Sequence, residues 1–387
     1  MPEHPEIVRV SAPGKLLLFG EHAVVYGCPA IAAALSDMRI QVTITRNYVF
    51  VGAEPAISFL CRDIMSSHNK LPLQRTYSTS TLQKVVDGLE DEIHYVPIPS
   101  EKVMTRIEST LDKETLEDAN AMRAVLFLCC ALLRYSEYLS GTKGGLHVEI
   151  KSFGLPIGAG LGSSAAMSVA LSGAFAELSE SPRKHELEFI NKYAFGAEVI
   201  LHGSPSGADN TVSCYGGSLR IQTLPDFSFQ RLQCSLHKFH FLLINTCVSR
   251  STKDQIDKVR KLYEFDHERV QGQFHSIQQI VDKFVALSER RVLSEEVLGQ
   301  LIERNQQNLV DFGVGHPQLD RVARICKRFN GATKLTGAGG GGCAVSLLPR
   351  SLSHKDLATL ISQLEAKGFE CFASSLSGPG LIRDLLT

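Results

Sequence analysis

The chain has 387 residues, 44% hydrophobic and 21% charged, a composition typical of globular proteins and a length that suggests two domains. Forty basic and 41 acidic side chains give a formal charge of −1, so no broad positive field would attract a nucleic-acid backbone. The amino terminus lacks the basic and apolar regions of a secretory signal, and the apolar run at 124–133 is too short to span a bilayer. The ten cysteines contain no C-x-x-C pair. We therefore expect a cytoplasmic protein with reduced thiols that binds neither nucleic acid nor membrane.

The first half of the sequence alternates strand-like and helix-like segments. A turn at 12–15 separates the first two predicted strands, and residues 50–118 give no clear pattern. The predicted elements are strands at 7–10, 16–19 and 40–44, a buried helix at 119–139 and a strand at 146–150.

Longer helical patterns follow residue 230. The predicted elements are a strand at 239–245, helices across 255–312 and 317–329, a strand at 342–348, a helix at 352–367 and a last strand at 370–374. This order predicts an α+β protein with an N-terminal domain over 1–230 and a C-terminal domain over 231–387.

The strongest local motif is a glycine-rich loop that follows a predicted strand and opens an alanine-rich helix at 163. Glycines allow close backbone approach to an anion, and the N–H groups at a helix start favour negative charge. The alternative is a structural turn with a serine N-cap, which needs at most one glycine. The loop has three alternating glycines and two serines, so we predict a phosphate site. Its residues are Gly158, Ala159, Gly160, Leu161, Gly162, Ser163 and Ser164.

Two common nucleotide motifs do not account for this loop. No Lys-Ser or Lys-Thr follows its last glycine, so it is not a Walker A motif. Its glycine spacing is also wrong for a dinucleotide fold. The run at 337–342 contains the string G-x-G-x-x-G, but a strand rather than a helix is predicted after it. We therefore do not expect a nicotinamide enzyme.

Two carboxylates and one lysine complete the predicted chemistry. Glu198 lies at the edge of the apolar stripe of a predicted helix, where it would either bind Mg²⁺ or form a salt bridge with a lysine or arginine. Asp209 lies in a predicted loop, where it would either cap a backbone N–H or orient an attacking hydroxyl. Lys15 is either a solvated surface group or the cation that stabilises Asp209 and the transferring phosphoryl group.

The loop at 334–343 contains four consecutive glycines between two predicted strands. Such a run destabilises a fold unless the backbone must approach another group closely. It is therefore either a flexible hairpin or a wall of the active site.

In combination, these motifs resemble the superfamily of galactokinase, homoserine kinase, mevalonate kinase and phosphomevalonate kinase, and within it the eukaryotic mevalonate kinases. The segments that carry the resemblance are 12–15, 20–25, 156–166, 202–210, 250–253 and 334–343. The resemblance implies a GHMP kinase fold, with a ribosomal-S5-like N-terminal domain, a ferredoxin-like C-terminal domain and the active site between them. It implies ATP-dependent phosphorylation of (R)-mevalonate to 5-phosphomevalonate in isoprenoid biosynthesis.

The resemblance also implies a role for each matching residue. Asp209 would be the catalytic carboxylate with Lys15 as its partner, and the glycine loop with Ser163 would surround the ATP phosphates. The implied Mg²⁺ ligands are Ser164 and Glu198, and the implied substrate residues are Glu21, His22 and Thr252. A homodimer and inhibition by prenyl diphosphates are further implications, while no adenine contacts are assigned.

Two alternatives stay open at this point. The apolar continuation at 23–27 suits a methyl-bearing acceptor better than a hexose, yet a few contacts separate mevalonate kinase from galactokinase, phosphomevalonate kinase or homoserine kinase. A non-catalytic metabolite sensor of the same fold would have lost Asp209, Lys15 or a magnesium ligand, and this chain retains all of them.

Overall fold

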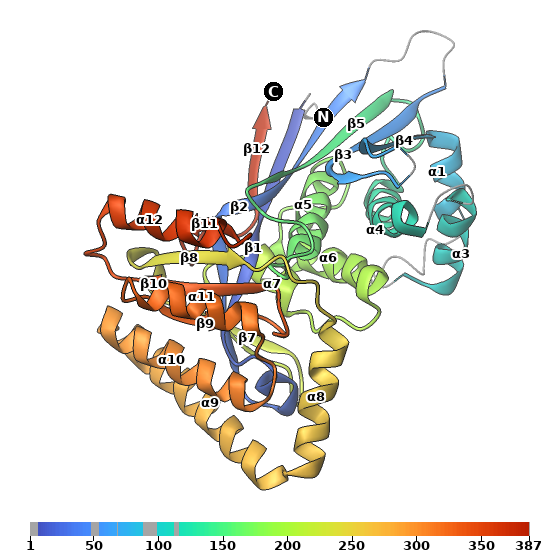
Figure 1. The fold of residues 1–387 in the computed structure, drawn as a ribbon. Helices are drawn as coiled ribbons and strands as arrows, with labels where there is room; N and C mark the ends of the chain where they lie inside the picture. Colours follow the sequence, from blue (N-terminus) through green and yellow to red (C-terminus); the bar gives the residue numbers. More distant parts are fainter. Residues whose placement is uncertain (1–6, 48–53, 68, 88–98, 112–115, 387) are drawn as a thin grey trace.

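The computed structural model describes residues 7–47, 54–67, 69–87, 99–111 and 116–386, which form two sheets and the helices that pack on them (Figure 1). The alternation of strands and helices, with mostly antiparallel pairing, confirms the predicted α+β class. Within the described residues, no helix combines the length and apolar character that a bilayer crossing requires.

The first sheet has eight strands and is built around two long ones. β1 (Ile7–Phe19) and β2 (Ala30–Asn47) pair along most of their length, and alternate residues of β1 such as Val8 and Val10 are buried. The main path runs β12-β1-β2-β5-β3-β4, with β6 paired to β2 and β7. The other strands are β3 (Ala56–Met65), β4 (Pro72–Ser78), β5 (Gly145–Phe153), β6 (Ser218–Gln222), β7 (Ser228–Leu232) and β12 (Ile382–Leu386).

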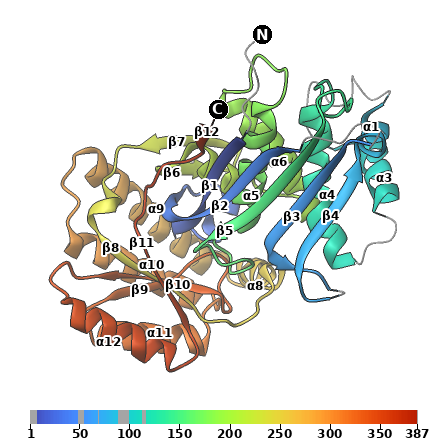
Figure 2. The same cartoon turned by 90° about the horizontal axis from the view of Figure 1, so that it is seen from above.

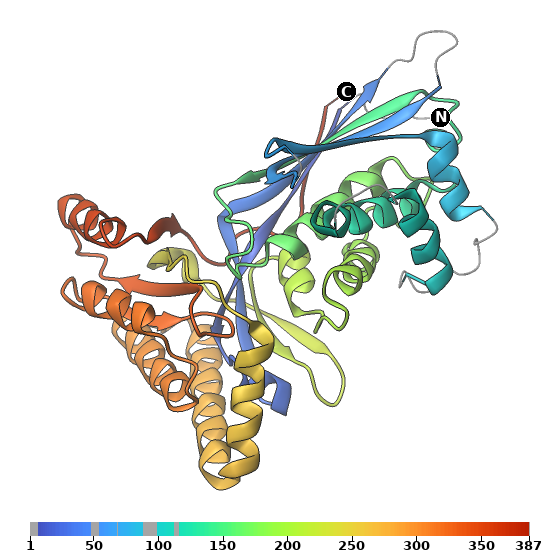
Figure 3. The ribbon, with the colours of Figure 1, turned by 45° about the vertical axis from the view of Figure 1, so that its right-hand side comes forward.

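The helices of this part lie on one side of the sheet, as the green and teal ribbons of Figure 3 show. The central one is α5 (Ser163–Glu177), which contacts both β1 and β2. Its small residues are buried on every side from Ala165 onward, which explains the alanine-rich sequence. Around it are α1 (Thr79–Val86), α3 (Glu101–Thr110), α4 (Leu116–Leu133), α6 (Leu187–His202) and α7 (Ala208–Tyr215).

The second sheet has four antiparallel strands in the order β11-β8-β10-β9 and lies to one side of the first (Figure 2). Its strands are β8 (His240–Asn245), β9 (Ala332–Leu335), β10 (Cys343–Leu348) and β11 (Glu370–Ser374). The helices are α8 (Thr252–Phe265), α9 (His267–Glu289), α10 (Glu295–Asp311), α11 (Pro317–Lys327) and α12 (His354–Glu365).

Several sequence predictions need correction. The predicted turn at 12–15 lies inside one continuous strand, because the pairing with β2 resumes after a register shift between Pro13 and Lys15. The helix predicted to reach 139 ends at Leu133. Asp209 lies in the first turn of α7 rather than in a loop.

Several observed strands were not predicted, among them β3, β4, β6, β7 and β12. After β11 the chain returns to the first sheet, where β12 pairs with β1. The domain boundary near residue 230 stays a prediction.

Candidate active site

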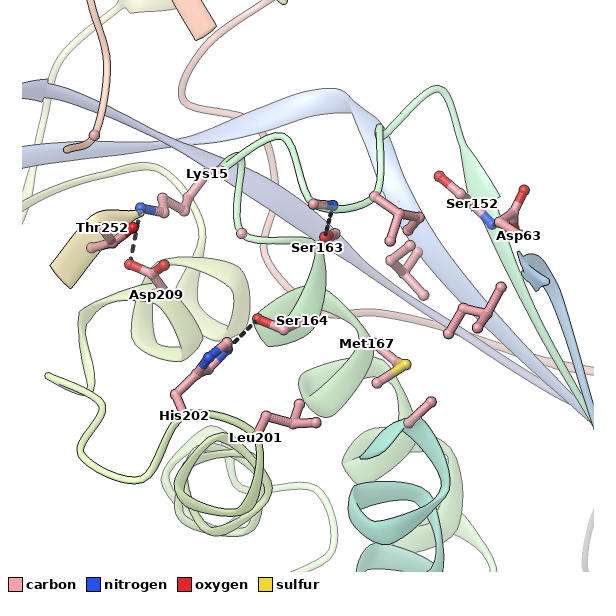
Figure 4. Close-up of a pocket in the computed structure, with 18 of the residues that line it drawn as sticks. Lys15, Asp63, Ser152, Ser163, Ser164, Met167, Leu201, His202, Asp209 and Thr252 are labelled. Atoms are coloured by element: carbon pink, nitrogen blue, oxygen red, sulfur yellow. Dashed lines mark hydrogen bonds and ion pairs between the residues drawn. The ribbon is translucent and has the colours of Figure 1, made fainter. Parts of the chain in front are cut away.

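The candidate site is a pocket of about 500 Å³ where elements of both sheets converge (Figure 4). The first sheet and the helices packed on it contribute Lys15 of β1, the loop between β5 and α5, the C-terminal end of α6 and the start of α7. The second contributes Thr252 at the start of α8 and Gly337 and Ala338 of the β9–β10 loop. This loop is therefore part of the pocket wall, as one of the two sequence interpretations proposed.

The glycine-rich loop connects β5 to the amino terminus of α5. Gly162 is the N-cap of α5 in a left-handed conformation, φ 74°, and no side chain caps the helix. The first N–H groups of α5 thus have no side-chain acceptor, which is the arrangement that binds anions. Ser163 accepts a hydrogen bond from the Gly158 N–H at 3.4 Å, so its hydroxyl supports the loop.

Five of the seven residues predicted at the phosphates line the pocket: Gly158, Gly160, Gly162, Ser163 and Ser164. The other two do not. Ala159 and Leu161 are buried in the hydrophobic core, and the Leu161 carbonyl accepts the Lys15 N–H at 2.8 Å. These two residues therefore anchor the loop to the core and to β1.

Lys15 and Asp209 form an ion pair of 3.1 Å at one end of the pocket. Lys15 of β1 reaches Asp209, which occupies the first turn of α7 after the N-cap residue Gly207. A carboxylate in a first turn is stabilised by the helix dipole. Lys15 is mostly buried and Asp209 is 43% exposed, so the carboxylate is open to a molecule in the pocket.

Glu198 is buried on α6 and faces the start of α5. Its two carboxylate oxygens accept hydrogen bonds from Ser164 at 3.3 Å and from Ser168 at 3.0 Å. Burial and the nearby charge of Asp209 raise the pKa of Glu198 to about 7. Among the described residues no lysine or arginine forms an ion pair with Glu198, and Nε2 of His202 lies 3.6 Å from its Oε2.

The same residues fit a magnesium ion whose remaining ligands are water and phosphate. No group of three or more His, Cys, Asp or Glu side chains in the described part of the chain could hold a metal ion. Mg²⁺, however, commonly takes one or two protein oxygens plus substrate phosphates. The Ser164 hydroxyl beside a buried carboxylate with a raised pKa is such a donor set, because a cation would stabilise the ionised form.

Glu21 differs most from its predicted role. Its side chain is fully buried, lies outside the pocket lining, and forms an ion pair with the fully buried Lys334 of β9. Asn305 of α10 donates a hydrogen bond to its second carboxylate oxygen at 3.0 Å. Glu21 therefore joins the end of β1 to the second sheet.

His22 and Thr252 have different surroundings. His22 is buried, and burial lowers its pKa, so the neutral ring donates from Nε2 to the Ala338 carbonyl at 2.9 Å. It thus positions the β9–β10 loop. Thr252 lines the pocket close to Lys15 and Asp209 (Figure 4).

Sequence reasoning missed a second half of the pocket. Its lining is mainly apolar and comes partly from the region 50–118 that showed no clear pattern. At its far side the Asp63 carboxylate accepts the Ser152 N–H at 2.6 Å (Figure 4). The apolar residues are Ile40, Cys61, Ile64, Ala121, Ile150, Ile157, Met167 and Leu201.

Three further polar residues had been assigned no role, although His202 and Arg250 lie in segments that carry the family resemblance. Ser168 follows Ser164 by four positions and His202 follows Glu198 by four, a spacing that places each pair on one helix face. That periodicity could have revealed them. Arg250 lines the pocket, but its sequence position before α8 gives no signal for where its side chain points.

Comparison with known proteins agrees with this arrangement. The GHMP kinases N terminal domain matches residues 124–217, and the GHMP kinases C terminal domain matches 293–352. The mevalonate kinases of Mus musculus and Homo sapiens are each 33% identical over 97% of this chain, covering 95% and 94% of those proteins. The mevalonate kinase of Arabidopsis thaliana is 30% identical over 96% of this chain and 98% of that protein.

Solved structures share the fold. A crystal structure of mevalonate kinase has a TM-score of 0.71 at 22% identity, covering 96% of this chain and 99% of that one. The L. major mevalonate kinase in complex with R-mevalonate has a TM-score of 0.66 at 22% identity, covering 97% and 96%. Since one third of the residues are identical to mammalian mevalonate kinases over nearly the whole chain, this protein belongs to the mevalonate kinase family of GHMP kinases.

Proposed function

We propose that this chain transfers the γ-phosphoryl group of ATP to the 5-hydroxyl of (R)-mevalonate and forms 5-phosphomevalonate. The observation that carries the proposal is the Lys15–Asp209 ion pair at the pocket wall, beside an uncapped helix start and a buried acid. A phosphoryl transferase needs these groups together: an anion site, a carboxylate for the acceptor hydroxyl and a cation for the transferred charge.

ATP would extend along the pocket from the apolar half to the glycine loop. The adenine would contact apolar residues such as Ile64 and Met167, and the phosphates would approach the N–H groups at the start of α5. Ser164 and Glu198 would hold Mg²⁺, which supplies charge neutralisation at the phosphates.

Asp209 would accept the hydrogen bond, and then the proton, of the acceptor hydroxyl. Lys15 holds that carboxylate in place and reduces the negative charge facing the incoming phosphates. A loose transition state requires little base strength, so orientation of the hydroxyl is the larger part of this role. Thr252 would contact the reacting groups. Glu21 and His22 would affect acceptor binding indirectly, because their contacts with Lys334 and Ala338 hold the β9–β10 loop in the pocket wall.

An ADP-release assay with MgATP and four acceptors tests the proposal. Turnover is expected on mevalonate and not on phosphomevalonate, galactose or homoserine. Turnover on another acceptor would change the assigned substrate but leave the assigned roles of the site residues unchanged. ATP binding without turnover on any of them would favour a metabolite sensor.

Four further properties are proposed from family resemblance. They are a cytoplasmic location, a role in isoprenoid and sterol biosynthesis, a homodimeric state, and inhibition by prenyl diphosphates that compete with ATP. The molar mass in solution tests the dimer. Kinetics with farnesyl diphosphate at several ATP concentrations test the inhibition. Competition with ATP should raise the apparent KM for ATP and leave kcat constant.

A further inference from the structure

His202 is a pocket residue to which the proposed function gives no role. It ends α6, four positions after Glu198, and its side chain reaches Ser164 in the first turn of α5 (Figure 4). Nε2 of the ring lies 3.0 Å from the Ser164 hydroxyl oxygen and 3.6 Å from Oε2 of Glu198. This histidine therefore contacts both residues proposed to hold Mg²⁺.

The Ser164 hydroxyl has one hydrogen and two acceptors within reach. These are Oε2 of Glu198 at 3.3 Å and Nε2 of His202 at 3.0 Å. A serine binds a cation through a lone pair of its oxygen, so the hydrogen has to point away from the ion and toward an acceptor. The choice of acceptor decides which oxygens are left for the metal.

A hydrogen on Oε2 of Glu198 and a cation compete for the same oxygen. The other carboxylate oxygen, Oε1, already accepts a hydrogen bond from Ser168 at 3.0 Å, and Ser168 is fully buried. When Ser164 donates to Glu198, both oxygens of the carboxylate are thus occupied. When it donates to His202, Oε2 and the lone pairs of Ser164 are left for the ion.

We propose that His202 is a positioning residue, which accepts the Ser164 hydrogen at Nε2 and so leaves the hydroxyl oxygen and Oε2 of Glu198 free for Mg²⁺. This inference rests on the proposed function and deepens it, because it explains how the two proposed ligands are oriented. The imidazole carries its own hydrogen on Nδ1 in this arrangement. His202 is not itself a ligand, because Mg²⁺ takes oxygen ligands.

Other roles for this histidine make different predictions. A histidine that only links α5 to α6 would affect stability and leave metal binding unchanged. A histidine that binds phosphate directly would affect ATP binding with or without a metal. The metal contribution to binding separates these cases. It is the Kd of ATP in chelator divided by the Kd of MgATP, both measured by calorimetry without an acceptor, so no turnover is needed.

The first test compares wild type with His202→Leu and His202→Gln. In His202→Leu the ratio of the two Kd values should fall about 10–100-fold, the usual loss when a metal ligand loses its hydrogen-bond partner, while the Kd of ATP in chelator stays unchanged. His202→Gln should recover part of the ratio, because its amide oxygen can accept a hydrogen bond near the place of Nε2. An unchanged ratio in His202→Leu would overturn the proposal, and so would weaker binding of ATP in chelator.

His185→Leu is a matched control. Nδ1 of His185 lies 3.3 Å from Oε1 of the buried Glu177, and its side chain is 62% exposed against 52% for His202. This pair lies outside the pocket lining, so the variant should keep the wild-type ratio. A fall as large as in His202→Leu would overturn the proposal.

A double variant tests whether His202 acts through Ser164. Ser164→Ala removes the hydrogen whose direction His202 sets, so adding His202→Leu should lower the ratio little further. A double variant that loses the product of both single effects would overturn the proposal.

Failure of this inference and failure of the proposed function give different results. A wild type that binds MgATP more tightly than ATP but phosphorylates no acceptor would contradict the proposed function, and a lower ratio in His202→Leu would still support the role of His202. Turnover on mevalonate with an equal ratio in wild type and His202→Leu would overturn the inference alone. A wild-type ratio near one would overturn the inference together with the magnesium assignment.

Discussion

The buried carboxylate of Glu198 should make the metal-free protein less stable as pH rises, and Glu198→Gln should remove this dependence. The pKa of Glu198 is raised from 4.5 to about 7, and each pKa unit corresponds to about 1.36 kcal/mol. The shift is therefore equivalent to about 3 kcal/mol of stability. Because the folded-state pKa is the higher one, this contribution is fully present below pH 4.5 and is lost as pH rises through about 7.

Urea unfolding of wild type and Glu198→Gln at pH values from 5 to 8, in chelator, measures the effect. The glutamine variant should gain up to about 3 kcal/mol relative to wild type across this range. Glu188→Gln is a suitable control, since Glu188 is an exposed carboxylate on the same helix. Asp209→Asn should reduce the pH dependence, because Asp209 is the second cause of the raised pKa.

Magnesium extends the same test to the metal site. Mg²⁺ with ATP should stabilise wild type at pH 8 more than Glu198→Gln, because a bound cation favours the ionised carboxylate. A constant stability difference between the two proteins from pH 5 to 8 would refute the reasoning. It would mean that Glu198 is ionised over the whole range without a cation.

Three further predictions follow from single contacts. Asp209→Asn should lower kcat roughly 10³-fold and leave MgATP affinity nearly unchanged in calorimetry, whereas near-normal turnover would show that this carboxylate is not catalytic. Lys334→Met should destabilise the fold by about 3–5 kcal/mol in urea unfolding, because Glu21 is left buried without its cation. Adding Glu21→Gln to that variant should recover part of the loss, and additive single effects would argue against the pair. Gly162→Ala would place a Cβ 2.8 Å from Cγ of Lys15, so kcat should fall with little change in the Kd of MgATP.

The sequence predicts the chemistry of this site better than its surroundings. The helix that carries Glu198, the glycine loop and the strands around it are found near their predicted positions, because periodicity and glycine spacing are local signals. The apolar half of the pocket could not be predicted, since it combines β2, β3, β5 and α4 across more than a hundred residues. The strand β12 was missed for the same reason, as only its pairing with β1 defines it.

Glu21 shows why residue type alone does not assign a role. A glutamate between glycine and histidine after a strand is compatible with a ligand contact, and the family resemblance implied one. Its partner Lys334 lies 313 positions away, and no local pattern connects the two. The pairing becomes visible only when β9 is placed against the end of β1.

The β9–β10 loop and the strand ends beside it make several contacts with the part of the chain that forms the first sheet. Four consecutive glycines make a segment entropically costly to order, so a free hairpin would be expected to move. The crossing contacts are Thr336 Oγ1 to the Leu17 carbonyl at 3.0 Å, His22 Nε2 to the Ala338 carbonyl at 2.9 Å, Cys343 Sγ to the Ala159 carbonyl at 3.3 Å, and the Lys334–Glu21 ion pair. They fix the loop at both ends and in its middle, and the Cys343 contact ends on the glycine-rich loop before α5. The β9–β10 loop and the glycine-rich loop before α5 are thus connected to each other, so a change at Lys334 should alter phosphate binding as well as stability.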